Sequence, residues 1–205
     1  MPGMAFGNFS MKLNDIRKPL VLFLFLTVIT GFFYPLLITG LAQLLFPRQA
    51  NGSLIVHGKR TIGSELLGQS FTEPRYFWGR PSATEPSPYT ATASSGSNLG
   101  PLNPALIGQV EKRLRVLRGA DSLQIQPVPV DLVTSSGSGL DPPISPLGAL
   151  YQVPRVARSR GRSEEQLRLL IRQCTEEGGF FGEPRVNVLR LNIALDSTES
   201  SKVRR

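Results

Sequence analysis

The feature that most constrains the fold is a run without any charged residue, Pro19–Pro47, in which most positions are Leu, Phe, Ile or Val. A helix of about 20 apolar residues is long enough to cross a lipid bilayer. The stretch Leu20–Leu41 reaches this length, and the apolar character continues to Phe46. We therefore expect one transmembrane helix over residues 19–46, preceded by a short cytoplasmic segment, residues 1–18.

Pro35 lies inside the apolar run and is expected to kink the helix, which membrane helices tolerate where freed backbone groups find partners. A cleaved signal peptide is the rival interpretation, but the apolar core is too long for one and no Ala-x-Ala site follows it. Three basic residues precede the run, Lys12, Arg17 and Lys18, and three follow it, Arg48, Lys59 and Arg60, but the first three lie closer to it on average. By the positive-inside rule this favours a cytoplasmic N-terminus and an extracytoplasmic C-terminal domain in the cell membrane.

Residues 47–196 are predicted to form one soluble α+β domain, followed by a disordered tail, residues 197–205. Three helix starts are predicted: at Asn103 before a proline, at Pro146 for a helix to residue 160, and at Ser163, which begins a capping box. Two short strands are expected around His57-Gly58-Lys59. A strand-like run over residues 123–134 is interrupted by prolines, and apolar residues alternate over residues 188–195 as in a half-buried strand. Helices and strands mix without a regular βαβ repeat, which is typical of α+β folds.

The formal net charge of the chain is +8, and part of the excess forms an arginine cluster after residue 154. We expect this cluster to be a solvated surface that faces a partner or lipid, because no aromatic residues interleave with it and a membrane anchor argues against nucleic acid. The cluster comprises Arg155, Arg158, Arg160, Arg162, Arg168 and Arg172. By contrast, the aromatic trio Tyr76-Phe77-Trp78 is expected in the core.

Familiar catalytic signatures do not occur in the sequence. It has no Walker A phosphate loop and no Gly-x-Ser-x-Gly nucleophile elbow. One histidine, His57, and one cysteine, Cys174, leave no Cys/His cluster for zinc and no internal disulfide. We expect His57 to be a solvated turn residue, and Cys174 a small core residue on the apolar stripe of its helix.

Two Ser/Gly-rich loops are the unusual feature of the domain: "SSGSNLGPLNP" from Ser94 and "TSSGSGLDPPISP" from Thr134. Both lead towards a predicted helix start, so their amides could form a nest for an anion. The alternative is that Ser, Gly, Asn, Asp and Pro are the residues that turns require. Asp141, the only charge in the second loop, could cap the next helix or meet a basic group on a partner, and we favour the second role.

Six motifs, in order behind one N-terminal span, resemble the KdpC family, the small C subunit of the bacterial Kdp potassium-transporting P-type ATPase. The resemblance extends from about Leu20 to Asp196. The motifs are "GSELLGQSF", "YFWGRPSAT", "SSGSNLGPLNP", "DLVTSSGSGLDPPISP", "QVPRVARSR" and "GEPRVNVLRLNIALD". One departure is Pro143, where the family usually has His after Asp-Pro, so any role of that histidine is not open to this chain.

The resemblance implies an accessory role in a complex whose KdpA subunit conducts potassium and whose KdpB subunit hydrolyses ATP. The Asp-Lys-Thr-Gly phosphorylation sequence of P-type pumps does not occur in this chain, so we expect no enzymatic activity of its own. The family is described as supporting assembly and as a catalytic chaperone that raises the ATP affinity of KdpB. We expect no cofactor of its own; ATP is bound by the partner subunit, and direct nucleotide contact stays open.

The two loops are accordingly expected to face partner subunits rather than to form an active site. The candidate partner or anion-binding residues are Arg80, Ser95, Gly96, Ser97, Asn98, Ser136, Gly137, Ser138, Gly139 and Asp141. Arg80 could pair with an acidic group on a partner. Two alternatives remain: a membrane-anchored hydrolase that uses Ser136 or Ser138, and an anchored extracytoplasmic solute-binding module.

Overall fold

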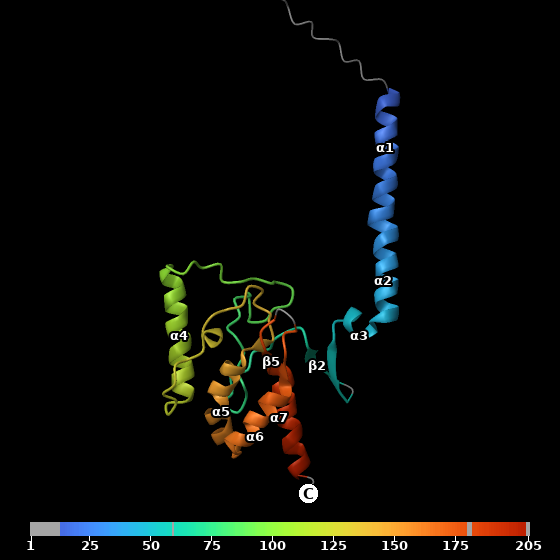
Figure 1. Ribbon diagram of the computed structural model, residues 1–205. Coiled ribbons are helices and arrows are strands. Elements are labelled where there is room, and N and C mark those ends of the chain that lie inside the picture. Colours follow the sequence, from blue (N-terminus) through green and yellow to red (C-terminus); the bar gives the residue numbers. More distant parts are fainter. Residues whose placement is uncertain (1–12, 59, 180–181, 204–205) are drawn as a thin grey trace, which may run out of the picture. The chain divides into compact units, whose positions relative to one another are not determined.

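The computed structural model describes residues 13–58, 60–179 and 182–203, and its contacts divide the chain into two compact units that meet between Asn51 and Gly52. Figure 1 labels the elements of both units along the chain. Each unit is described by itself.

The N-terminal unit is helical almost throughout and contains, over Ile16–Leu45, a helix long and apolar enough to span a membrane, with a mean hydropathy of 2.4. This confirms the predicted membrane helix, although helical structure already begins at Leu13, before the predicted start. The unit consists of α1 (Leu13–Val28), the π-helical turn η1 (Ile29–Phe33), α2 (Tyr34–Leu45) and the short α3 (Pro47–Ala50).

The predicted disturbance at Pro35 takes the form of the π-helical turn. The amide of Tyr34 donates to the carbonyl of Ile29, five residues back, instead of four. Pro35 has no N–H for the next bond, and its ring crowds the carbonyl of Gly31, four residues before it. A wider turn directly before a proline relieves this crowding and keeps the backbone helical within the membrane segment.

The second unit begins with an antiparallel hairpin, as predicted: β1 (Leu54–His57) pairs with β2 (Arg60–Ser64). The register shifts between Ile55 and Val56, where Ile62 is the additional residue of the opposite strand. The side-chain amide of Asn187 donates to the Glu65 carbonyl at 2.8 Å and so connects the end of the hairpin to the rest of the domain.

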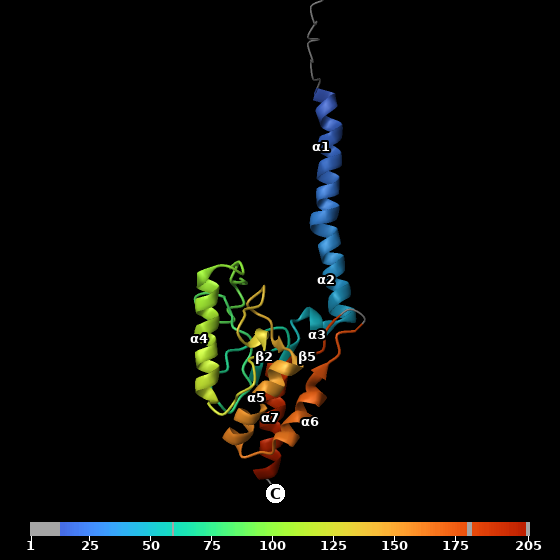
Figure 2. The ribbon, with the colours of Figure 1, turned by 60° about the vertical axis from the view of Figure 1, so that its left-hand side comes forward.

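A small antiparallel sheet and three helices form the centre of the domain, which confirms the α+β prediction. The sheet has the order β3 (Pro143–Ile144), β5 (Arg185–Asn187), β4 (Thr175–Glu176). Figures 1 and 2 show the three helices packed together beside this sheet. They are α5 (Pro146–Arg160), α6 (Glu164–Cys174) and α7 (Val188–Val203). A fourth helix, α4 (Pro104–Ala120), packs at the edge of the domain.

All three predicted helix starts are confirmed, and a side chain caps each helix. Asn103 accepts a hydrogen bond from the Ala105 amide at the start of α4. Ser145 accepts one from the Gly148 amide at the start of α5, so Asp141 does not cap this helix. Ser163 receives the Gln166 amide at the start of α6.

The strand predicted over residues 188–195 is wrong, because this segment belongs to helix α7. Val188, Asn192 and Leu195 are all at most 3% exposed and follow a helical spacing of four and three residues. The alternation of apolar residues favoured a strand, although the same residues also fit a helical pattern in which Asn192 occupies a core position. The helix also continues through residues 197–203, where a disordered tail was expected; residues 204–205 lie outside the described residues.

The strand-like run over residues 123–134 is also not a strand. It is irregular apart from a 3₁₀ turn, η2 (Val130–Leu132). Pro127 and Pro129 cannot donate hydrogen bonds to a sheet, and Gln124 instead donates its side-chain amide to the Tyr151 carbonyl of α5 at 3.0 Å. This segment therefore connects α4 to α5 through side-chain contacts.

The extended segment around Phe77 and Trp78 crosses the core, where the two side chains are 0% and 4% exposed, as predicted. Its backbone has no partner strand. Instead, Asn192 of α7 accepts from the Phe77 amide at 2.9 Å and donates to the Phe77 carbonyl at 3.0 Å. Gln152 of α5 makes the same pair of contacts with Trp78, at 2.8 and 3.0 Å. Two buried amide side chains thus replace a β-ladder.

Two members of the arginine cluster are internal, which corrects the prediction of a wholly solvated surface. Arg155 is 4% exposed and donates to the Tyr76 carbonyl at 3.0 Å and to Gln152 at 2.6 Å. Its guanidinium lies 4.3 Å from the centre of the Trp78 ring, and burial lowers its pKa to about 10. The Arg160 side chain is 1% exposed and donates to the Arg75 carbonyl at 2.7 Å. Both guanidinium groups thus donate hydrogen bonds to backbone carbonyls of the segment around Phe77. Arg158, Arg168 and Arg172 are exposed.

Candidate functional site

The two Ser/Gly loops lie against one another, although about 40 residues separate them in the sequence. The Ser95 amide donates to the Ser138 carbonyl at 2.9 Å, and the Ser94 hydroxyl donates to the same carbonyl at 3.1 Å. A Cβ on Gly96 would meet the Gly137 carbonyl oxygen at 2.8 Å, so the two backbones pack closely there. The loops therefore form one composite surface.

A third segment, residues 82–90, completes this surface. The Ser82 hydroxyl donates to the Gly139 carbonyl of the second loop at 2.6 Å and accepts from the Tyr89 amide at 2.9 Å. The Tyr89 hydroxyl donates to the Arg80 carbonyl at 2.6 Å, and burial raises the pKa of this phenol. These contacts fix the segment from both ends.

Gly139 is the position where the packing of the three segments requires a glycine. Its φ is +69°, a left-handed conformation that favours glycine. A Cβ there would lie 2.4 Å from the Ser95 carbonyl oxygen and 2.8 Å from the Thr84 methyl group.

Several polar groups of the second loop bind one another. The Gly139 amide donates to the Ser136 hydroxyl at 3.0 Å, and the next amide, of Leu140, donates to the Ser138 hydroxyl at 3.1 Å. The Ser138 hydroxyl in turn donates to the Asp141 carboxylate at 2.8 Å. These two consecutive amides are engaged within the loop, which favours the interpretation of its residues as turn residues over that of an anion nest.

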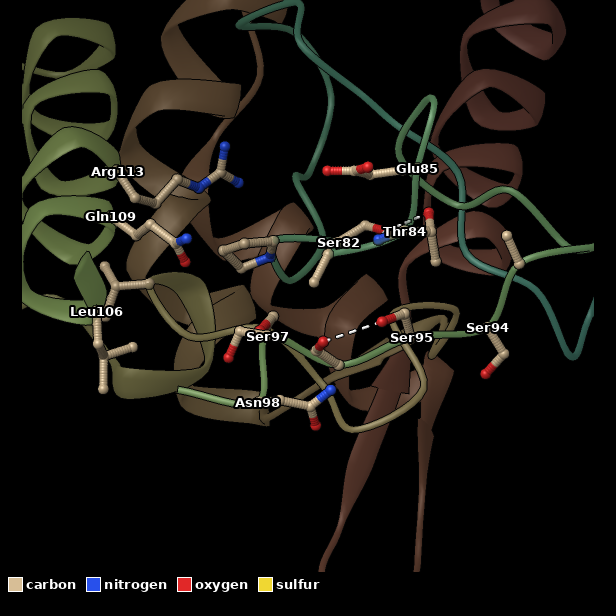
Figure 3. A pocket seen from close by; sticks show the side chains of 16 residues that line it. Ser82, Thr84, Glu85, Ser94, Ser95, Ser97, Asn98, Leu106, Gln109 and Arg113 are labelled. Carbon is tan, nitrogen blue, oxygen red and sulfur yellow. Dashed lines mark hydrogen bonds between the residues drawn. The ribbon is translucent and has the colours of Figure 1, made fainter. Parts of the chain in front are cut away.

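Beside the paired loops lies a pocket of about 690 Å³ between the first loop and α4. Its lining joins the first-loop candidates Ser95, Gly96, Ser97 and Asn98 to Ser82, Thr84, Glu85, Leu106, Gln109, Arg113, Val133 and Ser135, among others. Figure 3 shows Gln109 and Arg113 reaching from α4 towards the loops. The second-loop candidates, residues 136–139 and Asp141, support this pocket from behind and do not line it.

Arg113 is the cation of this pocket. Its Nε donates to the Leu132 carbonyl and its Nη2 to the Gly79 carbonyl, both at 3.1 Å, and its guanidinium lies 5.6 Å from the Trp78 ring centre. Burial lowers the pKa of this guanidinium. Within the described residues, Nη1 makes no hydrogen bond and the side chain forms no ion pair.

Several neutral donors around Arg113 are uncommitted. In the part of the chain that the structure describes, the side chains of Ser97, Asn98, Gln109 and Ser135 make no hydrogen bond. Asn98 also has a positive φ of 50°, which an asparagine tolerates at modest cost. The polar side chains of the site thus divide into one set that holds the loops together and a second set that faces the pocket.

Arg80 lies on the other side of the second loop. Its Nη2 donates to the Ser135 carbonyl at 3.3 Å, and its Nε is buried without a partner among the described residues. It lines a hollow of about 210 Å³ near the start of α5, with Pro143, Asp131 and Arg185 among its neighbours. Asp131 accepts from the Ser145 amide at 2.7 Å, so an internal carboxylate already occupies this helix end.

The two serines of the hydrolase alternative are engaged in contacts within the second loop. Ser136 is 4% exposed and its hydroxyl accepts from the Gly139 amide, while the Ser138 hydroxyl accepts from the Leu140 amide and donates to Asp141. The backbone of His57 belongs to strand β1. Over the described ranges, no group of three His, Cys, Asp or Glu residues is placed to hold a metal ion.

Sequence reasoning identified the first loop as one side of the pocket but did not identify the side formed by helix α4. Arg113 was not among the candidate residues identified from the sequence. However, Leu106, Val110, Arg113 and Leu117 follow a spacing of four, three and four residues, so Arg113 occupies a place on the inward stripe. This interruption of an apolar stripe by a cation is the signal that could have identified it.

Comparison with known proteins shows a close likeness over nearly the whole chain. The family model of KdpC, described as the c chain of the K⁺-transporting ATPase, matches residues 16–197. A relative from Methylococcus capsulatus is 58% identical over 187 residues, which is 90% of this chain and 98% of the relative. Relatives from Variovorax paradoxus and Sorangium cellulosum are 56% and 60% identical and cover 92% and 90% of this chain, with 99% and 98% of their own lengths. All three are named potassium-transporting ATPase KdpC subunit.

Proposed function

This chain belongs to the KdpC family, the C subunits of the potassium-transporting ATPase, and from this premise we propose that it acts as a non-catalytic accessory subunit. In this role it supports the assembly of a high-affinity, ATP-driven potassium uptake complex. It also acts as a catalytic chaperone that raises the affinity of the KdpB subunit for ATP. KdpA and KdpB are its proposed partners.

The observation that carries this proposal is the construction of the composite loop surface. The second-loop serines accept hydrogen bonds from neighbouring amides, and hydrogen bonds join the first loop to the second, which supports a preorganised surface. A preorganised surface binds a partner with less loss of conformational freedom than a flexible one. Such a surface is suited to positioning another subunit rather than to turning over a substrate.

The test is a comparison of the ATPase assembled with and without this chain. We expect the complete complex to show potassium-stimulated ATPase activity with a lower KM for ATP than the complex that lacks the chain. The purified chain alone should not hydrolyse ATP. An unchanged KM, with equal recovery of the other subunits in both preparations, would refute the proposal.

We also propose that the membrane helix has its N-terminus in the cytoplasm and that the domain after Asn51 is extracytoplasmic. Arg17 and Lys18, directly before the uncharged run that begins at Pro19, support this orientation. A reporter that is active only in the cytoplasm should stay silent when fused after Arg205 and should be active when fused to the N-terminus. The reverse pattern of activity would contradict the orientation.

A further inference from the structure

We propose that the pocket between the first loop and α4 receives an acidic side chain presented by another subunit of the ATPase, whose carboxylate Arg113 binds. The inference rests on the proposed function as an accessory subunit, and it names the chemistry by which one partner is recognised. Three features support it: the guanidinium of Arg113, the uncommitted donors around it and the exposed apolar side chains at the start of α4.

The charge argument starts from the environment of Arg113. Two of its nitrogens are held by the backbone carbonyls of Leu132 and Gly79, which fixes the guanidinium in one orientation. These carbonyls are neutral, and within the described residues no carboxylate forms an ion pair with this side chain. A half-buried cation without a counter-ion favours an incoming anion, because water screens the attraction less than it does at an exposed site. The free Nη1 supplies a donor for that anion.

The donors around Arg113 extend this preference. Gln109 and Asn98 carry amide NH₂ groups, while Ser97 and Ser135 carry hydroxyls, and all four can donate to carboxylate oxygens. A carboxylate accepts about four hydrogen bonds, so one guanidinium and a few neutral donors match its capacity. The neighbouring residues Ser82, Thr84 and Ser95 are instead engaged in contacts within the loops.

Exposed apolar side chains at the start of α4 indicate that the carboxylate belongs to a protein surface. Leu102, just before α4, is 91% exposed, and Ile107, in its first turn, is 53% exposed; neither of them lines the pocket itself. Apolar side chains next to a charged pocket gain from being covered by a partner, which removes their surface from water. Glu85, exposed on the opposite side, can meet a basic or hydroxyl group beside the acidic residue.

Gln109→Glu tests the charge requirement with little change of shape. The new carboxylate would stand beside Arg113 and repel the incoming one, while glutamate suits a helix as well as glutamine does. We expect the other subunits to bind this variant about tenfold more weakly, with a matching loss of potassium-stimulated activity at limiting chain concentration. Gln173→Glu, an equal charge change on the exposed face of α6, is the matched control and should behave as wild type.

A photo-crosslinking residue in place of Ser97 identifies the occupant within the assembled complex. The expected product joins this chain to a peptide of another subunit that contains Asp or Glu. Changing that acid to Lys should weaken the wild-type complex and restore binding to Gln109→Glu. A crosslink only to lipid, or a saturable small solute that raises the Tm of the full chain and blocks labelling, would overturn the proposal. Wild-type affinity of Gln109→Glu would overturn it as well.

The outcomes separate the inference from the function on which it rests. If the wild-type chain fails to co-purify with the other subunits, the accessory role itself is wrong. If the wild type co-purifies and Gln109→Glu does so equally well, only the pocket assignment is wrong. Melting of both full-length chains in detergent should give the same Tm, because the exposed Gln109 side chain makes no hydrogen bond within the described residues.

Discussion

Replacing Asn192 by Leu should strongly destabilise the domain, although the change is conservative in size. Asn192 is 1% exposed and Phe77 is 0% exposed, and the two reciprocal hydrogen bonds between them satisfy both backbone groups of Phe77. Leucine would leave the Phe77 amide and carbonyl buried without partners. At about 1–3 kcal/mol for each unsatisfied group, the expected loss in the free energy of unfolding is about 2–6 kcal/mol. This is a large fraction of the roughly 5–15 kcal/mol that stabilises a typical domain.

The assay is denaturant unfolding of the full chain in detergent, followed by tryptophan fluorescence. Trp78 is the only tryptophan of the chain and adjoins Phe77, so the signal reports on the segment that the amides hold. Gln173→Leu, on the exposed face of α6, is the control and should change the stability by less than about 0.5 kcal/mol. A loss below 1 kcal/mol for Asn192→Leu would show that the buried amide does not support the segment.

Asn192→Asp separates hydrogen bonding from packing. A protonated carboxyl can accept from the Phe77 amide and donate to the Phe77 carbonyl, as asparagine does, whereas a carboxylate would face that carbonyl without a proton to donate. Burial should therefore raise the folded-state pKa of this aspartate above its unfolded value of about 3.9. The variant should be close to wild type in stability at acidic pH and should lose stability as the pH rises. Equal destabilisation at every pH would contradict the hydrogen-bond argument.

Two further predictions concern the composite loop surface. Gly139→Ala should lower the free energy of unfolding by about 2–5 kcal/mol, because its backbone is left-handed and the added Cβ would lie 2.4 Å from a carbonyl oxygen. Gly100→Ala, where no atom lies within 4 Å of the added Cβ, is the control and should be nearly neutral. Equal effects of the two substitutions in thermal or denaturant unfolding would refute the packing argument. Tyr89→Phe should flatten the alkaline limb of the stability profile. Burial raises the pKa of Tyr89 in the folded chain above its ordinary value of about 10. Above that pH the phenol loses its proton more readily in the unfolded chain, so the stability of the wild type falls as the pH rises. Phenylalanine has no proton to lose, so the variant should lack this part of the fall in stability.

The sequence by itself determined those features that depend on neighbouring residues. The uncharged run predicted the membrane helix, because its length and apolarity match a bilayer independently of the fold of the other residues. Asn103 and Ser163 marked helix starts because a capping side chain reaches amides only two or three residues ahead. The start of α5 was predicted at Pro146, but its cap, Ser145, was found only in the structure. The family motifs likewise lie in continuous stretches, and the family model confirms them.

Tertiary structure decided the features that depend on residues far apart. The alternation over residues 188–195 predicted a strand, but helix α7 places Asn192 against Phe77, a partner 115 residues away that local periodicity cannot reveal. Arg155 was interpreted as a surface charge and Arg113 was not among the candidates, but carbonyls of the segment around Phe77 bind both: Tyr76 binds Arg155 and Gly79 binds Arg113. In each case the polar side chain is stable in the core because it hydrogen-bonds backbone amides or carbonyls that are not paired in a β-sheet. Only the folded chain brings these groups together.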